Sequence, residues 1–221
     1  TNQQTGQVFN LYGKLETISE KGQRNFFKEN LPVRFLDKFS LDTGVDYNAQ
    51  FSSPSGCGVM AGYDTRFDRI VMTKKDYLIT KTIKLGVFDN PFYSDEDILY
   101  YDYTLKQFFL QVEGEHVKTT LLEQGIDKSW TKSYSFSDQS WTSYHSYIPD
   151  WYLASDNGMF TYTTEDGLWE HNIEGSWRKL YGKYRRSSIE LIKNNDVITT
   201  KWWSEMMFQT EARDSEKTLR H

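Results

Sequence analysis

The chain has 221 residues, with 26 basic and 31 acidic side chains for a formal charge of −5, and a single cysteine. This length allows one or two domains with a core of their own, which excludes a peptide or a disulfide-stabilised miniprotein. The charges are spread along the chain, so no basic patch indicates tight binding of nucleic acid. The lone Cys57 excludes an intrachain disulfide and a cysteine-based zinc site.

The amino-terminal sequence indicates neither secretion nor a membrane anchor. Its first ten residues, "TNQQTGQVFN", lack a signal-peptide pattern, and no apolar run in the chain is long enough to span a bilayer. We therefore expect no membrane span. Because residue 1 is Thr rather than Met, we also expect the chain to be a processed product or one portion of a longer protein.

The clearest helix signal lies in "LETISEKGQRNFFKENLP" near the amino terminus. Thr17 precedes Glu20 by the three residues of a capping box, and Pro32 disfavours helical geometry in the residue before it. This pattern predicts one amino-terminal helix over about Ile18–Asn30, although Gly22 weakens it by roughly 1 kcal/mol relative to Ala.

From about residue 55 onward the sequence is typical of antiparallel strands. Aromatic residues make up 16% of the chain, and short runs of aromatic and β-branched residues alternate here with Gly, Asp and Asn clusters. Hairpins are predicted in "CGVMAGYDTRFDRIVMTKKDYLITKTI", in "DILYYDYTLKQFFLQVEG" with a turn near Leu105, and in "KSYSFSDQSWTSYHSYIP" with a turn near Asp138. Asp166-Gly167 in "MFTYTTEDGLWEHN" is the strongest hairpin signal.

Together these elements predict a mainly β chain whose antiparallel hairpins form part of a β-propeller-like body, with one amino-terminal helix. We divide the chain into an amino-terminal extension with the helix (1–40), a hairpin region (41–184) and carboxyl-terminal strands with a charged tail (185–221). The last dozen residues are polar and are expected to be exposed unless another chain covers them.

Signals for enzyme chemistry are weak. His145 and His171, with Asp150 and Glu170 near them in sequence, do not have the spacing of a metal site, and structural roles in turns are favoured. Carboxylate pairs for glycoside hydrolysis cannot be chosen among 31 acidic residues, and no phosphate-binding or nucleophile motif occurs. Cys57 is interpreted as a small buried side chain at the start of a strand. We therefore expect no catalysis, no metal and no cofactor.

An aromatic cluster in residues 141–152 leaves two interpretations open. Its rings, Trp141, Tyr144, Tyr147, Trp151 and Tyr152, could stack on sugars, but alternation along a strand places some in the core and others at the surface or an interface. The adjacent Trp202 and Trp203 must point to opposite faces of a strand, so one of them is a candidate interface residue.

The stretch "SWTSYHSYIPDWYLASDNGMFTYTTEDGLWEHN", followed by "YGKYRRSSIELIKNN" and "FQTEA", resembles the tail muzzle proteins of crAss-like phages, also called stabilisation proteins. These proteins in turn resemble the tail nozzles of podoviruses. The upstream "GVMAGYDTRFDRIVMTKKDY" is similar to the hairpin that precedes this motif in the family. The matching segments cover about residues 57–82 and 135–212, and family members are considerably longer than this chain. The motif positions are Trp141, His145, Pro149, Asp150, Gly167, Trp169, His171 and Asn172.

The resemblance implies a structural protein of the virion tail. It implies a propeller-like body, a six-fold assembly with neighbouring tail proteins around the channel through which viral DNA leaves, and no catalysis. Mild acidity suits a channel through which DNA slides without sequence-specific binding. The alternative is a host-surface glycan-binding module at the tail tip, and a glycan-degrading depolymerase is the least favoured reading.

Overall fold

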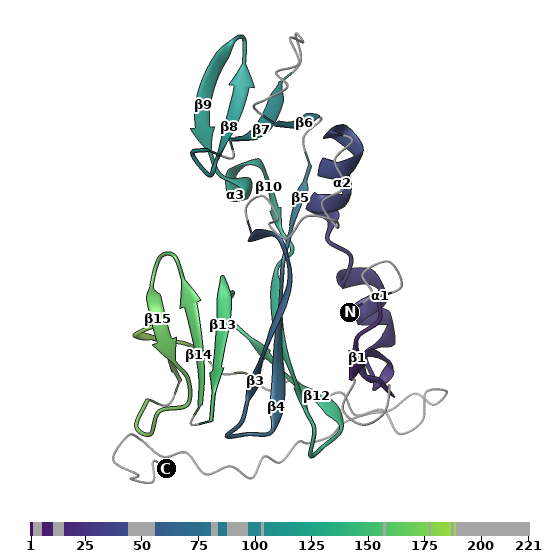
Figure 1. The fold of residues 1–221 in the computed structure, drawn as a ribbon, viewed down its shortest axis with the longest axis vertical. Coiled ribbons are helices and arrows are strands. Elements are labelled where there is room, and N and C mark those ends of the chain that lie inside the picture. The colour runs from purple at the N-terminus through teal and green to yellow at the C-terminus, as the bar shows by residue number, and fades with distance from the viewer. Residues whose placement is uncertain are drawn as a thin grey trace, which may run out of the picture. The chain divides into compact units, whose positions relative to one another are not determined.

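The computed structural model describes residues 1, 6–10, 16–43, 56–80, 84–87, 97–102, 104–156, 158–176, 178–186 and 188. The chain divides into two compact units, Thr1–Glu170 and His171–His221. The described residues are mainly in strands, which confirms the mainly β prediction. The first unit contains most of these strands and all of the described helices (Figure 1).

The amino-terminal segment differs from its prediction. The short strands β1 (Phe9–Asn10) and β2 (Glu16–Thr17) pair, a single 3-10 turn covers Ile18–Glu20, and helix α1 begins only at Arg24 and ends at Asn30 as predicted. The Thr17 side chain makes no capping hydrogen bond, so the predicted capping box is wrong. Gly22 has a φ of +71°, a left-handed conformation that stops a helix, and helix α2 (Arg34–Thr43) follows α1.

A four-stranded antiparallel sheet, with the order β12-β11-β4-β3, forms the centre of the first unit. Hairpins join its strands in pairs, and the two hairpins meet where β11 pairs with β4 from Trp130↔Lys74 to Ser135↔Arg69. The predicted turn near Asp138 connects the second pair. The strands are β3 (Gly58–Asp64), β4 (Arg69–Lys75), β11 (Trp130–Ser135) and β12 (Ser140–His145).

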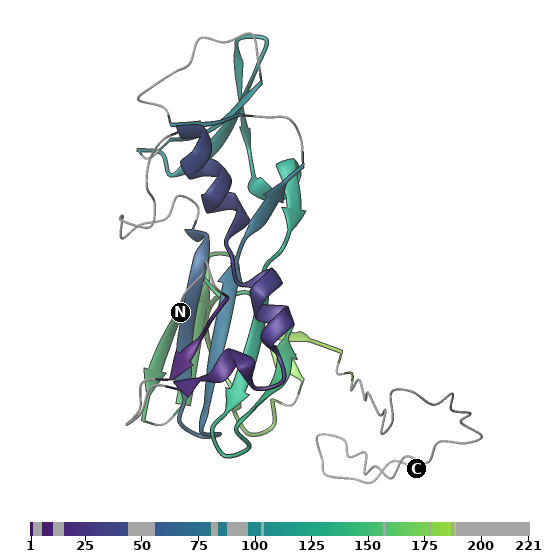
Figure 2. The same cartoon turned by 90° about the vertical axis from the view of Figure 1, so that its right-hand side faces the viewer.

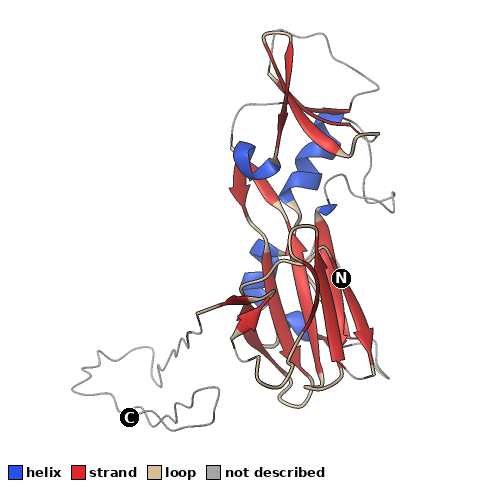
Figure 3. Cartoon of the chain, turned by 90° about the vertical axis from the view of Figure 1, so that its left-hand side faces the viewer, coloured by secondary structure: helices blue, strands red, loops and turns tan. Residues whose placement is uncertain are grey.

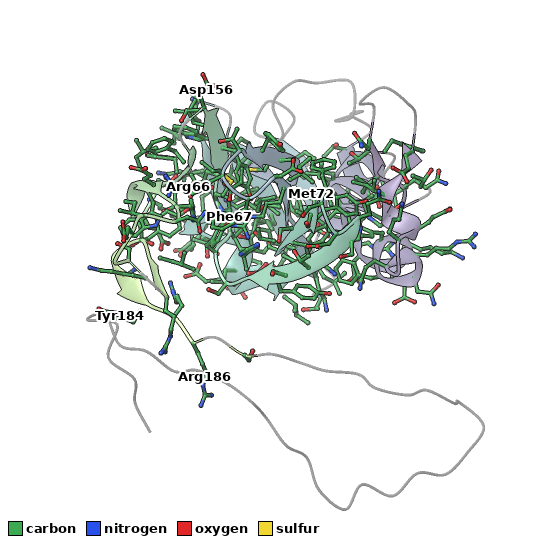
Figure 4. The ribbon with its side chains drawn as sticks, turned by 90° about the horizontal axis from the view of Figure 1, so that it is seen from below. Arg66, Phe67, Met72, Asp156, Tyr184 and Arg186 are labelled. Carbon is green, nitrogen blue, oxygen red and sulfur yellow. The ribbon has the colours of Figure 1, made fainter. Side chains whose placement is uncertain are left out.

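Helix α1 covers one face of this sheet (Figure 2). Phe27 of the helix and Leu31, directly after it, are buried against Met72, Trp130 and Tyr134. Each fully buried side chain of this size contributes about 2 kcal/mol by leaving water. The alternating residues of β4 and β11 thus give the sheet an apolar face toward the helix, and Met72 lies among the packed side chains (Figure 4).

A three-stranded sheet covers the opposite face (Figure 3). Its order is β13-β14-β15, with β13 at Trp151–Ser155, β14 at Gly158–Thr163 and β15 at Gly167–Glu170. The ring of Tyr152 lies directly on Gly62, where a Cβ would approach ring atoms to 2.7 Å, and its hydroxyl shares a 2.6 Å hydrogen bond with Thr73. Gly62 is therefore what allows the two sheets to pack closely.

A second core lies around α2. Phe35 and Phe39 of this helix pack with Leu99 and Phe108, which belong to a sheet of order β6-β7-β8-β9. Within this sheet β6 and β7 pair in parallel, and the other described neighbours pair antiparallel. The strands are β6 (Lys84–Val87), β7 (Ile98–Asp102), β8 (Gln107–Val112) and β9 (Glu115–Thr119). The short helix α3 (Leu121–Gln124) contacts the strand pair of β5 (Tyr77–Ile79) and β10 (Gly125–Asp127), and β5 also contacts α2.

The predicted hairpins are confirmed within the described residues. β3 and β4, β7 and β8, β11 and β12, and β14 and β15 each pair as consecutive antiparallel strands. The Asp166-Gly167 hairpin has three loop residues, because Thr163 pairs with Gly167, whose φ is +77°. Each described sheet is open, so the part of the chain that the structure describes contains no propeller or closed barrel.

The second unit contributes one described hairpin, β16 (Lys179–Leu180) with β17 (Lys183–Tyr184). The predicted domain limits at residues 40 and 184 stay predictions. The first of them falls inside α2.

Candidate functional site

The outer face of the β13-β14-β15 sheet is the strongest candidate site. Trp151 of β13 lies opposite Tyr162 of β14, which lies opposite Leu168 of β15. The next row on the same face runs from Leu153 to Phe160 and then to Glu170. Because alternate residues of a strand point to one side, five apolar side chains share this surface, which we call the outer face: Trp151, Leu153, Phe160, Tyr162 and Leu168.

The outer face is exposed to an extent unusual for such large apolar side chains. Trp151 is 43% exposed, Leu153 50% and Leu168 56%. On the inner face of the same strands, Met159 and Thr161 are fully buried against the central sheet. The strands are therefore apolar on both sides, which is the pattern of a middle layer rather than of a surface layer. A contiguous exposed apolar patch of this kind marks an interaction surface.

The indole of Trp151 and the ring of Tyr162 are stacked, with centroids 5.2 Å apart and an interplanar angle of 16°. This pair is a flat aromatic surface with polar groups only at its edges. Such a surface can receive an apolar side chain or a ring from another protein, or the apolar face of a sugar. The sequence correctly indicated that the rings of residues 141–152 would separate. Tyr147 is buried, whereas Tyr144 and Trp151 are exposed.

Asp150 holds the edge of this sheet in place. Its carboxylate accepts hydrogen bonds from Lys75 Nζ at 2.7 Å and from the backbone N–H and hydroxyl of Thr164 at 2.7 and 2.9 Å. It thereby ties the start of β13 both to β4 and to the β14–β15 turn. Burial raises the pKa of Asp150, but the hydrogen bond and charge of Lys75 and the Thr164 donors outweigh it, so the pKa lies below its ordinary value.

The remaining motif positions have structural surroundings. Trp141 donates from Nε1 to the carbonyl of Ile18 at 2.9 Å and packs 4.5 Å from Phe27, which joins β12 to the amino-terminal segment. The ring of His145 lies 5.2 Å from that of Tyr147, and Pro149 is buried. Trp169 lies on the inner face of β15, in register with Thr161.

Two motif positions belong to the second unit. His171 is buried, with its ring edge-on to Tyr181 at 6.1 Å. Asn172 is exposed and has a φ of +63°, a conformation that Asn tolerates in turns. The motif positions of each unit thus serve separate packing and turn contacts.

Lys132 is a buried cation that the sequence did not reveal. Its Nζ lies 4.2 Å from the ring centroid of Phe26 and 4.0 Å from that of Tyr144, and it donates to Gln23 Oε1 at 2.8 Å. Burial lowers the pKa of Lys132 to about 8. The amine is enclosed between α1 and the sheet, so we assign it to the helix–sheet contact.

The remaining sequence predictions concern Cys57, metal binding, membrane spans and the two adjacent tryptophans near the carboxyl terminus. Cys57 is buried directly before β3, as predicted. Among the described residues, no group of His, Cys, Asp and Glu side chains has the arrangement of a metal site, and no helix is both long and apolar enough to cross a membrane. Trp202 and Trp203 lie outside the described residues.

Comparison of the chain with models of protein families, with curated proteins and with solved structures finds no match.

Proposed function

We propose that this chain is a structural component of a phage tail, one portion of a muzzle or nozzle subunit that lines the exit channel of the DNA and helps to retain the packaged genome. In this proposal the chain has a structural role in the assembly and does not catalyse a reaction. The proposal combines the resemblance of the motif segments with one structural observation, the apolar outer face of the β13-β14-β15 sheet.

The apolar outer face supports a structural role in an assembly, because contact with a partner would remove its exposed side chains from water. The inner face of the same sheet is already packed on the central sheet, so the outer rings and leucines are not required for the fold of the first unit. Exposing them to water is unfavourable by about 25 cal/mol per Å² of apolar surface. A permanent interface between subunits removes this surface from water, and obligate interfaces are accordingly the most apolar ones.

The proposal includes the partners and the larger body. The partners are further copies of the chain in a six-fold ring and neighbouring tail proteins, within the virion tail. Viral DNA passes the ring without sequence-specific contacts. The open antiparallel sheets are taken as part of a propeller-like body that other portions of the subunit complete.

The experiment is a measurement of molar mass by light scattering over a wide range of concentration, for the chain and for the variants Leu153→Lys and Leu168→Lys. We expect defined oligomers of the chain and weaker association of both variants. Glu115→Lys, on the exposed strand β9, is the matched control and is expected to associate like the parent. A parent chain that stays monomeric at every concentration would contradict the proposal.

The stacked pair of Trp151 and Tyr162 favours glycan binding as a second candidate. A sugar that stacks on this pair would raise the melting temperature of the chain in proportion to its occupancy. A panel of polysaccharides with the parent and Trp151→Ala tests this function. A glycan that stabilises only the parent, together with a monomeric chain, would favour the second candidate over the first.

A further inference from the structure

The outer face belongs to an acidic segment of the chain. Residues 150–170 contain five carboxylates and neither Lys nor Arg. Glu165 and Asp166 are exposed in the β14–β15 turn, next to the row of Trp151 and Tyr162. Asp156 is exposed in the turn at the other end, where Glu170 lies in the row of Leu153 and Phe160. Two cations of the neighbouring β3–β4 hairpin also lie at these ends, Lys75 on Asp150 and Arg66 beside Gly158, so carboxylates outnumber cations around the apolar surface.

The β16–β17 hairpin of the second unit has the opposite character. Residues 178–186, "RKLYGKYRR", contain five cations and no carboxylate, although the whole chain carries a charge of −5. Arg178, Lys183, Arg185 and Arg186 are exposed. Two hydrogen bonds close the hairpin at its base, from Arg185 N–H to the Arg178 carbonyl at 2.8 Å and from Arg178 Nε to the Arg185 carbonyl at 3.2 Å.

An exposed aromatic ring lies in the middle of these cations. Tyr184 on β17 is 78% exposed, and the side chains of Tyr184 and Arg186 extend outward from the hairpin (Figure 4). Each strand of this hairpin has only two residues. A two-stranded hairpin is marginally stable by itself, so contact with another surface would stabilise it.

From these two surfaces we propose that the β16–β17 hairpin of one copy docks on the outer face of a second copy. Tyr184 lies against the apolar rows of the acceptor, and the hairpin cations face the carboxylates of its β14–β15 turn. This inference rests on the proposed function and names the contact through which the assembly forms. We take a second copy as the acceptor because every copy of the chain carries both surfaces, the β16–β17 hairpin and the outer face, and these two surfaces complement each other in charge and in apolar content.

The pairing also accounts for the type of assembly. Two outer faces placed against each other would bring carboxylates together, and two hairpins would bring cations together, so neither surface suits contact with itself. A contact between two different surfaces is heterologous, and repeated heterologous contacts close into a ring or continue as a filament. A cyclic tail assembly requires this kind of contact.

The test is a charge swap on the full chain. One variant reverses the hairpin (Arg185→Glu with Arg186→Glu), a second reverses the acceptor (Glu165→Lys with Asp166→Lys), and a third carries all four changes. Lys118→Glu with Lys128→Glu, both at exposed positions outside the two surfaces, is the matched control. Association is measured by sedimentation velocity at several concentrations and two salt concentrations.

We expect each reversal alone to raise the concentration for half-association at least tenfold, the four-residue swap to restore most of the loss, and the control to resemble the parent. An equimolar mixture of the two reversal variants should regain association with the two variants alternating, because the intact hairpin of one fits the intact acceptor of the other and the reversed hairpin fits the reversed acceptor as in the four-residue swap. Parent association should weaken as salt screens the charges.

Two results would overturn the inference in distinguishable ways. A parent that forms oligomers which neither reversal weakens would refute this contact and leave the proposed function standing. A parent that is monomeric at every concentration would refute the proposed function as well. If the reversals lower the melting temperature of such a monomer and the four-residue swap restores it, the hairpin docks on its own chain instead of on a second copy.

Discussion

Asp76 offers the sharpest test of how the first unit is held together. It follows β4, its side chain is fully buried, and its two carboxylate oxygens accept hydrogen bonds from the backbone N–H groups of Arg34 and Phe35 at 3.0 and 2.9 Å. It therefore caps the start of α2. The same carboxylate forms an ion pair at 2.7 Å with Lys74, whose Nζ also donates to the carbonyl of Pro32 at 2.6 Å.

We predict that Asp76→Ala lowers the free energy of unfolding by about 4 kcal/mol. Loss of the helix cap costs about 1 kcal/mol, and removal of one member of a buried ion pair costs about 3 kcal/mol or more because the other charge remains buried. Burial already lowers the pKa of Lys74, and the hydrogen bond that Lys74 donates to Asp76 partly offsets this shift. In the variant this offset is gone, so the cost of keeping the ammonium charged increases.

The assay is urea unfolding followed by tryptophan fluorescence, since Trp130 donates to the carbonyl of Asn30 beside this junction. The double variant Lys74→Met with Asp76→Ala is the decisive comparison. It removes both charges, so we expect it to be more stable than Asp76→Ala alone by about 2 kcal/mol. A cost below about 1 kcal/mol for Asp76→Ala, or simple additivity of the two single changes, would refute this reasoning.

Three further predictions concern the sheets and the helix. Asp150→Asn should lower the free energy of unfolding by about 2 kcal/mol at pH 7, because the carboxylate accepts three hydrogen bonds, one of them from a cation. Because the folded pKa of Asp150 lies below its ordinary value of 3.8, this contribution is complete above that pH and is lost as the pH falls through the folded pKa; a difference from the parent that grows as the pH falls below 3.8 would contradict it. Lys132→Met should be at least as stable as the parent near pH 7, because the cation–π contacts offset only part of the cost of burying the ammonium. The folded pKa of about 8 lies below the ordinary value, so the free energy of unfolding of the parent should rise by about 2 kcal/mol relative to the variant as the pH rises from about 8 toward 10.5. Chemical unfolding at each pH measures this difference in stability, and a difference that does not change with pH would refute the prediction. Gly62→Ala should cost about 2 kcal/mol, since the new Cβ would lie 2.7 to 2.8 Å from Tyr152 atoms, whereas Gly158→Ala, whose nearest contact is 3.8 Å, should unfold at a temperature several degrees higher than Gly62→Ala does.

The hairpins were predictable from local signals because each needs only its own turn and alternation. The turns near Leu105, Asp138 and Gly167 are all present. The start of α1 was not predictable with the same rule. Thr17 and Glu20 have the spacing of a capping box, but Gly22 adopts a positive φ in the folded chain, and Ile18–Glu20 form only a 3-10 turn that follows the paired strands β1 and β2.

The basic hairpin could have been found without a structure. Five cations in the nine residues "RKLYGKYRR" stand out against the net charge of −5, but an even distribution of charge along the chain was assumed. The amino-acid sequence alone does not show that Tyr184 and most of these cations are exposed on one small hairpin.

The sequence by itself determined the mainly β class, the positions of the hairpins, and the separation of the aromatic rings between core and surface. These features depend on alternation and turn residues a few positions apart, which act before any distant contact forms. Only the tertiary structure decided which face of β13-β14-β15 is covered, that Asp76 caps α2 from 41 residues away, and that Lys132 lies among aromatic rings. Burial of one face and exposure of the other depend on which layer packs against which, and that choice is made by contacts between segments far apart in the chain.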